Sequence, residues 1–430
     1  MNKSLYIVAF SLAFATTGIA QNNEGQDKVI DLGTQTTTEL RKTQAVSTIY
    51  SDELDKNATT SPYNAIYGLL PGLSVMQNTS WGTDKSRLNV RGRGSLNGDT
   101  PLFVVDGFAR PLEYINLSEI ESISVLKDGA ATALWGGRGA NGVVLITTKR
   151  GIYNQKDIKV DYKFGLGLPV NQPEFADAYT YAKARNEALR YDGLQPDMDE
   201  ASFLSGGNSD LYPNVDWQKE ALRNHTTSHQ LDITFRGGGK RLRYFSVLNY
   251  KNDMGLLNSK YTDYTDRYNS QMKKYFLNLR MNLDVDITDA TKLKLSMLGM
   301  LRETKRPTTS EATLFEQIFN TPSAAFPVQT QNGFWGSNNV LKTNPIANLA
   351  DVGYYKLNQR MLQADLRLVQ DLSVLTRGLS AELAIAYDNN ATYQETAKKS
   401  FMYQTIEKGT DGEPIYTNYG NPNDELEIIN

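Results

Sequence analysis

The sequence predicts an exported protein with a small mixed α/β domain followed by antiparallel β-strands long enough to cross a membrane. Three observations support this fold class. The chain begins with a segment typical of a secretory leader, and residues 47–151 alternate short helical and strand segments. Beyond residue 151, apolar and polar side chains alternate over stretches of about eleven positions.

Residues 1–20 are interpreted as a signal peptide. Lys3 precedes an apolar run from Leu5 to Ala15, and small residues then lead to Gly18 and Ala20. This run is shorter than the roughly 20 residues that a membrane-spanning helix needs, so a cleaved leader is favoured over an uncleaved helix. We expect an exported mature chain that begins near Gln21, without a lipoprotein anchor because no cysteine stands there.

The composition argues against several functional classes. The 430 residues include no cysteine, and the formal net charge is −3 with both signs mixed along the chain. A nucleic-acid-binding protein would show a basic stripe, so we expect no nucleic-acid partner. No paired-carboxylate, triad or metal-ligand spacing stands out, and we therefore expect no catalytic residue, no metal and no enzymatic activity.

The sequence predicts that the small domain is compact and contains both helices and strands. Ser61 and Pro62 form a helix start, and Pro71-Gly72 forms a stop. Short strands follow in the segments SRLNVRG and PLFVVDG, then the acidic turn NLSEIES, a strand ISVLK, a helix DGAATALW and a strand VVLITTK. We assign residues 47–151 to one domain.

Within it, Gly137, Gly139 and Gly142 spell the G-x-G-x-x-G pattern of dinucleotide sites. That site needs a strand before the glycines and a helix after them, because the pyrophosphate binds the helix N-terminus. Here a helical segment precedes the glycines and a β-branched strand follows. The pattern therefore predicts a tight turn and no cofactor.

The long strands lie in residues 152–430. In residues 158–168, apolar side chains alternate with Lys, Asp and Gly, and residues 276–288 repeat the pattern. Residues 231–250 read as two strands hinged at Gly237–Gly239. A membrane barrel and a soluble sandwich both produce such strands; their length favours the barrel, since about 9–11 residues cross a bilayer. Helical segments are expected at residues 173–189 and 311–320.

The segment from Leu88 to Gly151 resembles the plug domain of TonB-dependent outer-membrane transporters, and more narrowly the SusC/RagA family. The resemblance rests on motifs in order and spacing: R-G-R-G-S-L, V-V-D-G, I-E-S-I-S-V-L-K-D and G-R-G-A-N-G-V-V-L-I-T-T-K. The matching motif residues are Arg91, Gly92, Arg93, Gly94, Asp106, Gly107, Lys127, Asp128, Gly137, Gly139, Asn141 and Gly142.

The resemblance implies a barrel of about 22 strands that encloses the plug. Its implied function is import of a large nutrient, with an oligosaccharide as the expected substrate, across the outer membrane of a Gram-negative cell. The implied partners are TonB with ExbB and ExbD, a SusD-like surface lipoprotein and outer-membrane lipid. A siderophore or cobalamin receptor, an exported sandwich or adhesin, and a non-functional remnant are the alternatives.

Individual residues receive roles from the same resemblance. Residues 21–46 would form a periplasmic tail, in which Val29, Ile30, Asp31 and Leu32 are the candidate segment that pairs with TonB as an added strand. Arg91, Arg93 and Asp106 are expected to pair within the plug or with the barrel wall, because buried charges need partners.

Two aromatic residues are candidate ligand contacts, Trp335 and Tyr354, although aromatic side chains also form membrane-interface girdles. Residues 152–430 hold six to eight expected spanning strands, far fewer than the roughly 22 that enclose a plug. We therefore expect the chain to be the N-terminal part of a longer protein.

Overall fold

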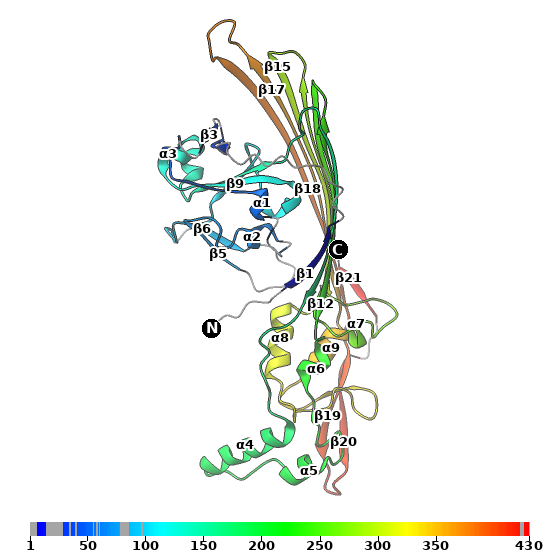
Figure 1. Ribbon diagram of the computed structural model, residues 1–430. Helices are drawn as coiled ribbons and strands as arrows, with labels where there is room; N and C mark the ends of the chain where they lie inside the picture. The colour runs from blue at the N-terminus through cyan, green and yellow to red at the C-terminus, as the bar shows by residue number, and fades with distance from the viewer. Residues whose placement is uncertain are drawn as a thin grey trace.

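The computed structural model describes residues 7–13, 29–33, 36–38, 41–54, 56, 59, 61–77, 86–95, 98–421 and 425–429. A small α/β domain lies against one face of a long curved sheet, and a body of helices and short strands lies at one end of that sheet (Figure 1). No helix in these ranges is long and apolar enough to cross a membrane.

The small domain is built on a five-stranded sheet of order β4-β9-β10-β7-β8. Its strands are β4 (Val46–Tyr50), β7 (Leu102–Val105), β8 (Phe108–Ala109), β9 (Ile120–Leu126) and β10 (Val143–Thr148). Strand β9 is antiparallel to β4 and to β10, and β10 is parallel to β7. Two further pairs are β2 (Val29–Asp31) with β3 (Thr36–Thr38), and β5 (Leu73–Met76) with β6 (Arg87–Val90).

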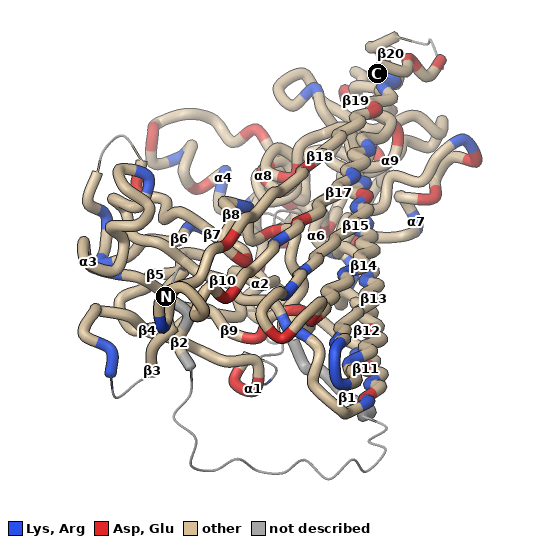
Figure 2. The backbone as a smooth tube through the Cα atoms, turned by 90° about the horizontal axis from the view of Figure 1, so that it is seen from above, with Lys and Arg blue, Asp and Glu red and all other residues tan. Residues whose placement is uncertain are grey.

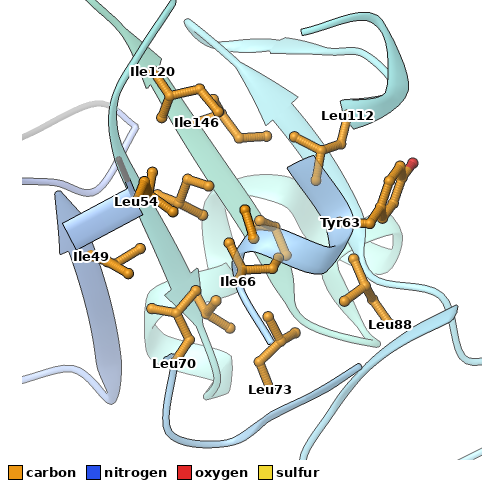
Figure 3. Packing of buried hydrophobic residues seen from close by; sticks show 14 of the residues in the cluster. Ile49, Leu54, Tyr63, Ile66, Leu70, Leu73, Leu88, Leu112, Ile120 and Ile146 are labelled. Carbon is orange, nitrogen blue, oxygen red and sulfur yellow. The ribbon is translucent and has the colours of Figure 1, made fainter. Parts of the chain in front are cut away.

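Helical turns cover one side of this sheet and enclose an apolar core (Figure 3). They are α1 (Ser51–Leu54), α2 (Pro62–Ala65), η1 (Leu112–Tyr114) and η2 (Leu117–Glu119). Leu54, Ile66 and Leu112 point into the core and are fully buried. The helix expected after Ser61 is only this one turn, α2, and the Ser61 side chain makes no capping hydrogen bond.

The expected order of helix, glycines and strand is confirmed. Helix α3 (Gly129–Thr132) continues into η3 (Ala133–Gly139), and β10 follows the glycines. Gly142 has a φ of 90°, and a Cβ there would meet the Val90 Cβ at 2.8 Å, so this position requires glycine. Gly139 is crowded by Trp135 and Thr132, whereas a Cβ on Gly137 would meet nothing within 4 Å and its φ is not positive, so this position does not require glycine.

The long sheet is antiparallel throughout, in the order β1-β11-β12-β13-β14-β15-β17-β18-β21. Its seven long strands agree with the expected six to eight: β11 (Lys156–Gly167), β12 (Thr226–Gly238), β13 (Leu242–Met254), β14 (Lys273–Asp286), β15 (Thr291–Pro307), β17 (Gly353–Asp371) and β18 (Ser380–Lys398). The short strand β21 (Glu427–Ile429) pairs with the end of β18. The sheet does not close on itself.

Strand β14 shows how the face of the sheet toward the small domain differs from the outward face. Its polar side chains Asn278 and Arg280 are 0% and 2% exposed and face the small domain, whereas Leu279 is 43% exposed on the other face. A soluble sandwich would bury the apolar face instead. Apolar side chains outside and polar side chains inside are the arrangement of a membrane barrel wall, which excludes the sandwich and adhesin alternative.

The two ends of the long sheet differ. Short turns connect β12 to β13, β14 to β15 and β17 to β18 at one end, which we call the short-turn end. At the opposite, long-loop end, the connections form a body with its own apolar core. This body contains α4 (Ala178–Tyr191), α5 (Glu200–Ser205), α6 (Trp217–Ala221), α7 (Ser259–Thr262), α8 (Glu311–Asn320), α9 (Pro345–Ala350), β16 (Trp335–Ser337), β19 (Met402–Lys408) and β20 (Pro414–Gly420). The helices expected at residues 173–189 and 311–320 correspond to α4 and α8.

Residues 7–13 of the expected signal peptide form β1 (Ile7–Ala13), which pairs with the edge of β11. The backbone N–H and C=O groups along that edge favour pairing with any apolar extended segment. Removal of residues 1–20 remains a prediction of the sequence, as do the domain boundaries at residues 46 and 151.

Candidate functional site

The surface where the small domain meets the long sheet is the candidate site. Both views place the domain on the inner face of β11 to β18, and Figure 2 shows acidic and basic residues along this boundary. We call the inward-facing residues of these strands the wall, and the surface between them and the small domain the domain–wall contact. Within the described residues, four charged residues of the domain form ion pairs with the wall: Arg110, Glu119, Glu121 and Arg150.

Glu119 is the most deeply buried of these residues. It ends η2, where it forms a capping box with Asn116: the Asn116 N–H donates to Glu119 Oε1 at 3.3 Å. Its carboxylate is fully buried and accepts hydrogen bonds from Arg280 Nε and Asn278 Nδ2 of the wall. Burial raises the pKa of Glu119, although the positive charge of Arg280 opposes this shift.

Arg110 follows β8 and links the domain to two neighbouring wall strands. Its Nη1 donates to Asp365 Oδ2 of β17 at 2.6 Å, and its Nη2 donates to Asp388 Oδ1 of β18 at 2.6 Å. Burial lowers the pKa of Arg110, but the hydrogen bonds to both carboxylates outweigh it, so the net shift is upward. The guanidinium therefore stays charged and fixes the domain to β17 and β18.

Arg150 fixes the point where the chain leaves the small domain for the first wall strand. Its Nη1 donates to Asp284 Oδ1 at 2.8 Å, and its Nη2 donates to Ser296 Oγ at 2.8 Å. Next to it, Asn282 Nδ2 donates to Thr148 Oγ1 at 2.9 Å. These bonds hold the end of β10 against β14 and β15.

One apolar patch interrupts this polar contact. Tyr114 of the domain packs against Phe276, Leu298, Met300 and Met361 of the wall. Around this patch the domain–wall contact contains ion pairs, hydrogen bonds and the Arg367 guanidinium of the wall, 5.9 Å from the ring centroid of Phe108. A buried ion pair adds little net stability compared with an apolar pair of the same volume, so this contact fixes position without the adhesion of an apolar core.

Asp106 and Gly107 form the two-residue turn between β7 and β8. Their φ angles are 47° and 91°, as a hairpin turn with two positive φ values requires, and Asp-Gly suits it. The Asp106 carboxylate accepts hydrogen bonds from Thr148 N at 3.0 Å and Thr148 Oγ1 at 2.6 Å. The backbone oxygen of Asp106 accepts from Arg367 Nη2 of the wall at 2.8 Å. Asp106 thus pairs both inside the domain and with the wall.

The R-G-R-G motif follows β6. Arg91 and Gly92 have φ angles of 57° and 87° and turn the chain, whereas a Cβ on Gly92 or Gly94 would meet nothing within 4 Å. Arg93 lies 3.6 Å from Asp99, a pair within the domain. Neither arginine has an ion pair with the wall within the part of the chain that the structure describes.

Lys127 and Asp128 tie the start of β4 to the rest of the domain. Lys127 Nζ donates to Ser47 Oγ at 2.6 Å and to the oxygen of Pro71 at 3.0 Å. Asp128 Oδ2 accepts from the Ala45 N–H at 2.8 Å, and Oδ1 accepts from the Ala131 N–H as the N-cap of α3. These two N–H groups hold the pKa of Asp128 below its ordinary value.

Asn141 lies on the glycine turn, close to the loop that follows the R-G-R-G motif. Its Nδ2 donates to the oxygen of Gly98 at 3.2 Å. Gly98 has a φ of 131° and belongs to that loop. The two motifs therefore contact each other, and both serve the shape of the domain.

The tail segment expected to pair with TonB is strand β2. It forms a hairpin with β3, in which Ile30 pairs with Thr37. Ile30 and Leu32 are 1% and 7% exposed and pack against Val46 and Leu126 of the small domain. The segment is therefore extended, as expected, but in this structure it is docked on the domain.

The two candidate ligand aromatics lie at the long-loop end. Trp335 is 3% exposed in the core of the loop body, and its Nε1 donates to Asp351 Oδ2 at 3.0 Å. Tyr354 packs against Tyr268 with ring centroids 5.7 Å apart. Trp335 also lines a cleft of about 230 Å³ beside Tyr264, a residue that is 45% exposed.

Arg110, Glu119 and Arg150 were not singled out by sequence reasoning. One signal was available for their partners: Asn278, Arg280, Asn282 and Asp284 recur at every second position of a strand whose other face is apolar. Such a face needs polar partners when it is covered. The sequence does not say which residue of the small domain covers it.

Comparison with known proteins identifies the class. Residues 38–143 match the family described as the TonB-dependent Receptor Plug Domain. The curated relatives include TonB-dependent receptor SusC of Bacteroides thetaiotaomicron, 30% identical over 283 residues, a match that covers 62% of this chain and 26% of SusC. TonB-dependent receptor P26 of Formosa agariphila is 28% identical over 281 residues, covering 64% of this chain and 26% of P26.

Among solved structures, the RagAB peptide importer in the closed-closed state matches with a TM-score of 0.67 and 18% identity. The match covers 83% of this chain and 42% of that chain. The chain thus spans about a quarter of the length of the curated relatives that it matches.

A plug domain bound to the inner face of a partial barrel wall defines the class: residues 38–143 belong to the plug-domain family of TonB-dependent receptors, and the strands after them match the fold of part of such a receptor's barrel. Its relatives within that class are SusC and RagA-like proteins, as the sequence motifs indicate. The assignment to a receptor family confirms that the chain is not an enzyme. From here on, the small domain is called the plug.

Proposed function

We propose that this chain is part of a transporter that imports a large nutrient, an oligosaccharide, across the outer membrane by coupling to TonB. The observation that carries the proposal is the domain–wall contact, in which Arg110 and Glu119 of the plug are buried and pair with charged residues of the wall. Such a contact closes the lumen and is made of hydrogen bonds that can be exchanged one by one. The oligosaccharide is the substrate class implied by the resemblance of the plug motifs to the SusC/RagA family.

The tail supplies a path for force into the plug. Strand β4 is an edge strand of the plug sheet, and its first residue, Val46, pairs with Leu126 at the end of β9. A pull on the preceding chain would first break the Ala45–Asp128 hydrogen bond and then peel β4 from β9 pair by pair. Peeling breaks hydrogen bonds in succession rather than together, so it needs less force than shearing.

The partners follow from this path. TonB, with ExbB and ExbD, would bind Val29 to Leu32 by strand addition after the segment leaves its docked position. The short-turn end and the tail would then face the periplasm, and the long-loop end would face out of the cell. A SusD-like surface lipoprotein would cover the long-loop body.

A pair of proline variants tests the coupling. Ile30→Pro removes a backbone donor from β2 and blocks strand addition, whereas Thr37→Pro disturbs the same hairpin from β3 and leaves residues 29–32 intact. In the full-length receptor, uptake of a labelled oligosaccharide should be lost in Ile30→Pro and retained in Thr37→Pro. Equal loss in both would show that the hairpin, not the segment, matters.

The cleft beside Tyr264 is where we expect a sugar ring to stack. Asp351, which accepts a hydrogen bond from Lys399 Nζ at 2.6 Å, lies in the same cleft and offers a polar partner for hydroxyl groups. Tyr264→Ala should weaken oligosaccharide binding. Tyr191→Ala, which removes a ring that is 91% exposed at the end of α4, should not.

A siderophore or cobalamin receptor is the second candidate. The Ferrienterobactin receptor of Escherichia coli is 29% identical over 177 residues, covering 35% of this chain. Because the fold also matches a RagAB peptide importer, peptides belong in the same assay. Uptake of labelled glycans, peptides, cobalamin and ferric chelates by the same cells discriminates among these substrates; uptake of ferric chelates alone would overturn the oligosaccharide proposal.

A further inference from the structure

We propose that the outer face of β14, β15 and β17 binds a membrane glycolipid that carries two phosphates. The proposed site has three parts along the strands, an apolar groove, a polar aromatic row and two sets of cations, which together we call the outer-face site. It concerns the surface that meets lipid and does not depend on what the receptor transports.

The groove is centred on Gly299 of β15. Gly299 pairs with Leu279 on one side and Leu362 on the other, and the groove also includes Leu277 and Leu301. It has a volume of about 400 Å³. A Cβ on Gly299 would meet nothing within 4 Å, so the missing side chain leaves open space between exposed leucines. This space suits an acyl chain.

Arg360 stands at the rim of the groove. It pairs in register with Leu301, lines the groove and is exposed. An arginine on a lipid-facing apolar surface is costly unless its guanidinium reaches the headgroup region. Within the described residues Arg360 has no acidic partner at ion-pair distance. A phosphate of the lipid headgroup would supply that partner.

A second set of cations lies further toward the long-loop end. Lys273, Lys305 and Lys356 occupy one row of paired residues across β14, β15 and β17. Glu303 lies between two of them, 3.3 Å from Lys305 and 3.4 Å from Lys356. Glu395 ends the same row and accepts a hydrogen bond from Tyr354. With Arg360, four cations face two carboxylates, so the surface attracts anions.

The spacing of the cations indicates two phosphates. Arg360 and Lys356 are four residues apart on one strand, a separation of about 13 Å along the sheet. The row between them contains Tyr275, Glu303, Asn358 and Tyr393, in register across the four strands. The carboxylate of Glu303 disfavours a phosphate in this row, whereas the two tyrosine rings and the amide of Asn358 suit a sugar. A headgroup of sugars with a phosphate at each end matches this order.

The order of the parts also favours a lipid over a protein partner. From the middle of the strands toward the long-loop end, the surface changes from apolar groove to cation, then to aromatic and polar residues, then to cations. This is the order of acyl chain and headgroup in one leaflet, and aromatic residues at that depth are typical of membrane interfaces.

The test uses the full-length receptor in phosphatidylcholine nanodiscs and diphosphorylated lipid A as the probe, with bound lipid counted by native mass spectrometry. The triple variant Lys305→Gln/Lys356→Gln/Arg360→Gln should bind lipid A about a hundredfold more weakly, because each cation near the membrane surface contributes about one kcal/mol. Gly299→Leu fills the groove and keeps every charge, and it should also weaken binding. Arg377→Gln, an exposed cation in the turn at the short-turn end, is the matched control and should bind normally.

Lipid A with one phosphate should bind more weakly than the diphosphorylated form, and added salt should weaken both. The proposal is overturned if the triple variant retains lipid A at wild-type level, or if Gly299→Leu binds as the wild type does. Equal binding of the two lipid A forms would overturn the two-phosphate assignment. Folding of each variant is checked by the heat-modified gel mobility of the barrel.

Discussion

Removing the positive charge of Arg280 gives the sharpest test of the domain–wall contact. Arg280 is 2% exposed, and its Nε donates to the fully buried carboxylate of Glu119. The variant Arg280→Met keeps an unbranched side chain of similar length and leaves Glu119 without its cation. Breaking a buried pair in this way costs about 3–5 kcal/mol, because an uncompensated charge remains in a site shielded from water.

The loss should depend on pH with a defined sign. Burial already raises the pKa of Glu119 in the folded receptor, and loss of Arg280 raises it further. A carboxyl group whose folded pKa lies above its unfolded pKa loses stability as pH rises through the folded pKa. The variant should therefore be most destabilised at neutral and alkaline pH, and acidification should recover part of the loss as Glu119 takes up a proton.

The assay is hydrogen exchange of the β9 amides, residues 120–126, in the full-length receptor. Their opening free energy should fall by about 3–5 kcal/mol in Arg280→Met. The double variant Glu119→Gln/Arg280→Met restores a neutral pair and should recover most of the loss. If the two single effects simply add in the double variant, to within about 0.5 kcal/mol, the two residues are not coupled and the reasoning is refuted.

Three further predictions concern the plug and the leader. Gly142→Ala should lower the opening free energy of the β10 amides by about 1–3 kcal/mol, because the new Cβ meets Val90 and the φ is positive. Gly137→Ala should change the same free energy by less than about 0.5 kcal/mol. Equal effects of the two substitutions would contradict the prediction. Asp128→Ala should lower the opening free energy of the β4 amides, measured by hydrogen exchange, by about 1–3 kcal/mol at neutral pH. The loss should shrink as pH falls through the depressed pKa of the wild-type carboxyl. A loss that does not change with pH would count against the charged cap. N-terminal sequencing of the membrane-inserted protein should begin near Gln21, and a mature chain that starts at Met1 would exclude the signal peptide.

Much of the fold was predictable because it depends on local pattern. The alternation in residues 276–288 identified β14 and both of its faces, and the glycine hinge at Gly237–Gly239 separated β12 from β13. The order of helix, glycines and strand was enough to argue against a dinucleotide site. Helix α2 was overestimated because a start and a stop signal do not supply the apolar spacing that a longer helix needs.

The candidate site was only half predictable. The inward polar face of β14 was visible in the sequence, but its partner in the plug was not, since Glu119 and Arg280 are 161 residues apart. The motif residues Arg91, Arg93 and Lys127 were expected to be important, and they fold the plug rather than pair with the wall. Conversely, Arg110 lies outside the V-V-D-G motif and reaches two wall strands.

By itself, the sequence determined the class of the molecule: period-two strands with one apolar face, a mixed domain before them and a leader-like start. These features depend on residues that are close in the sequence, so they can be recognised without knowledge of distant contacts. Only the tertiary structure decided which plug residues meet the polar face of the wall, that Ile30 and Leu32 are docked, and that Gly299 opens a groove beside Arg360. Each of these depends on strand register and burial between segments far apart in the chain, which no local pattern specifies.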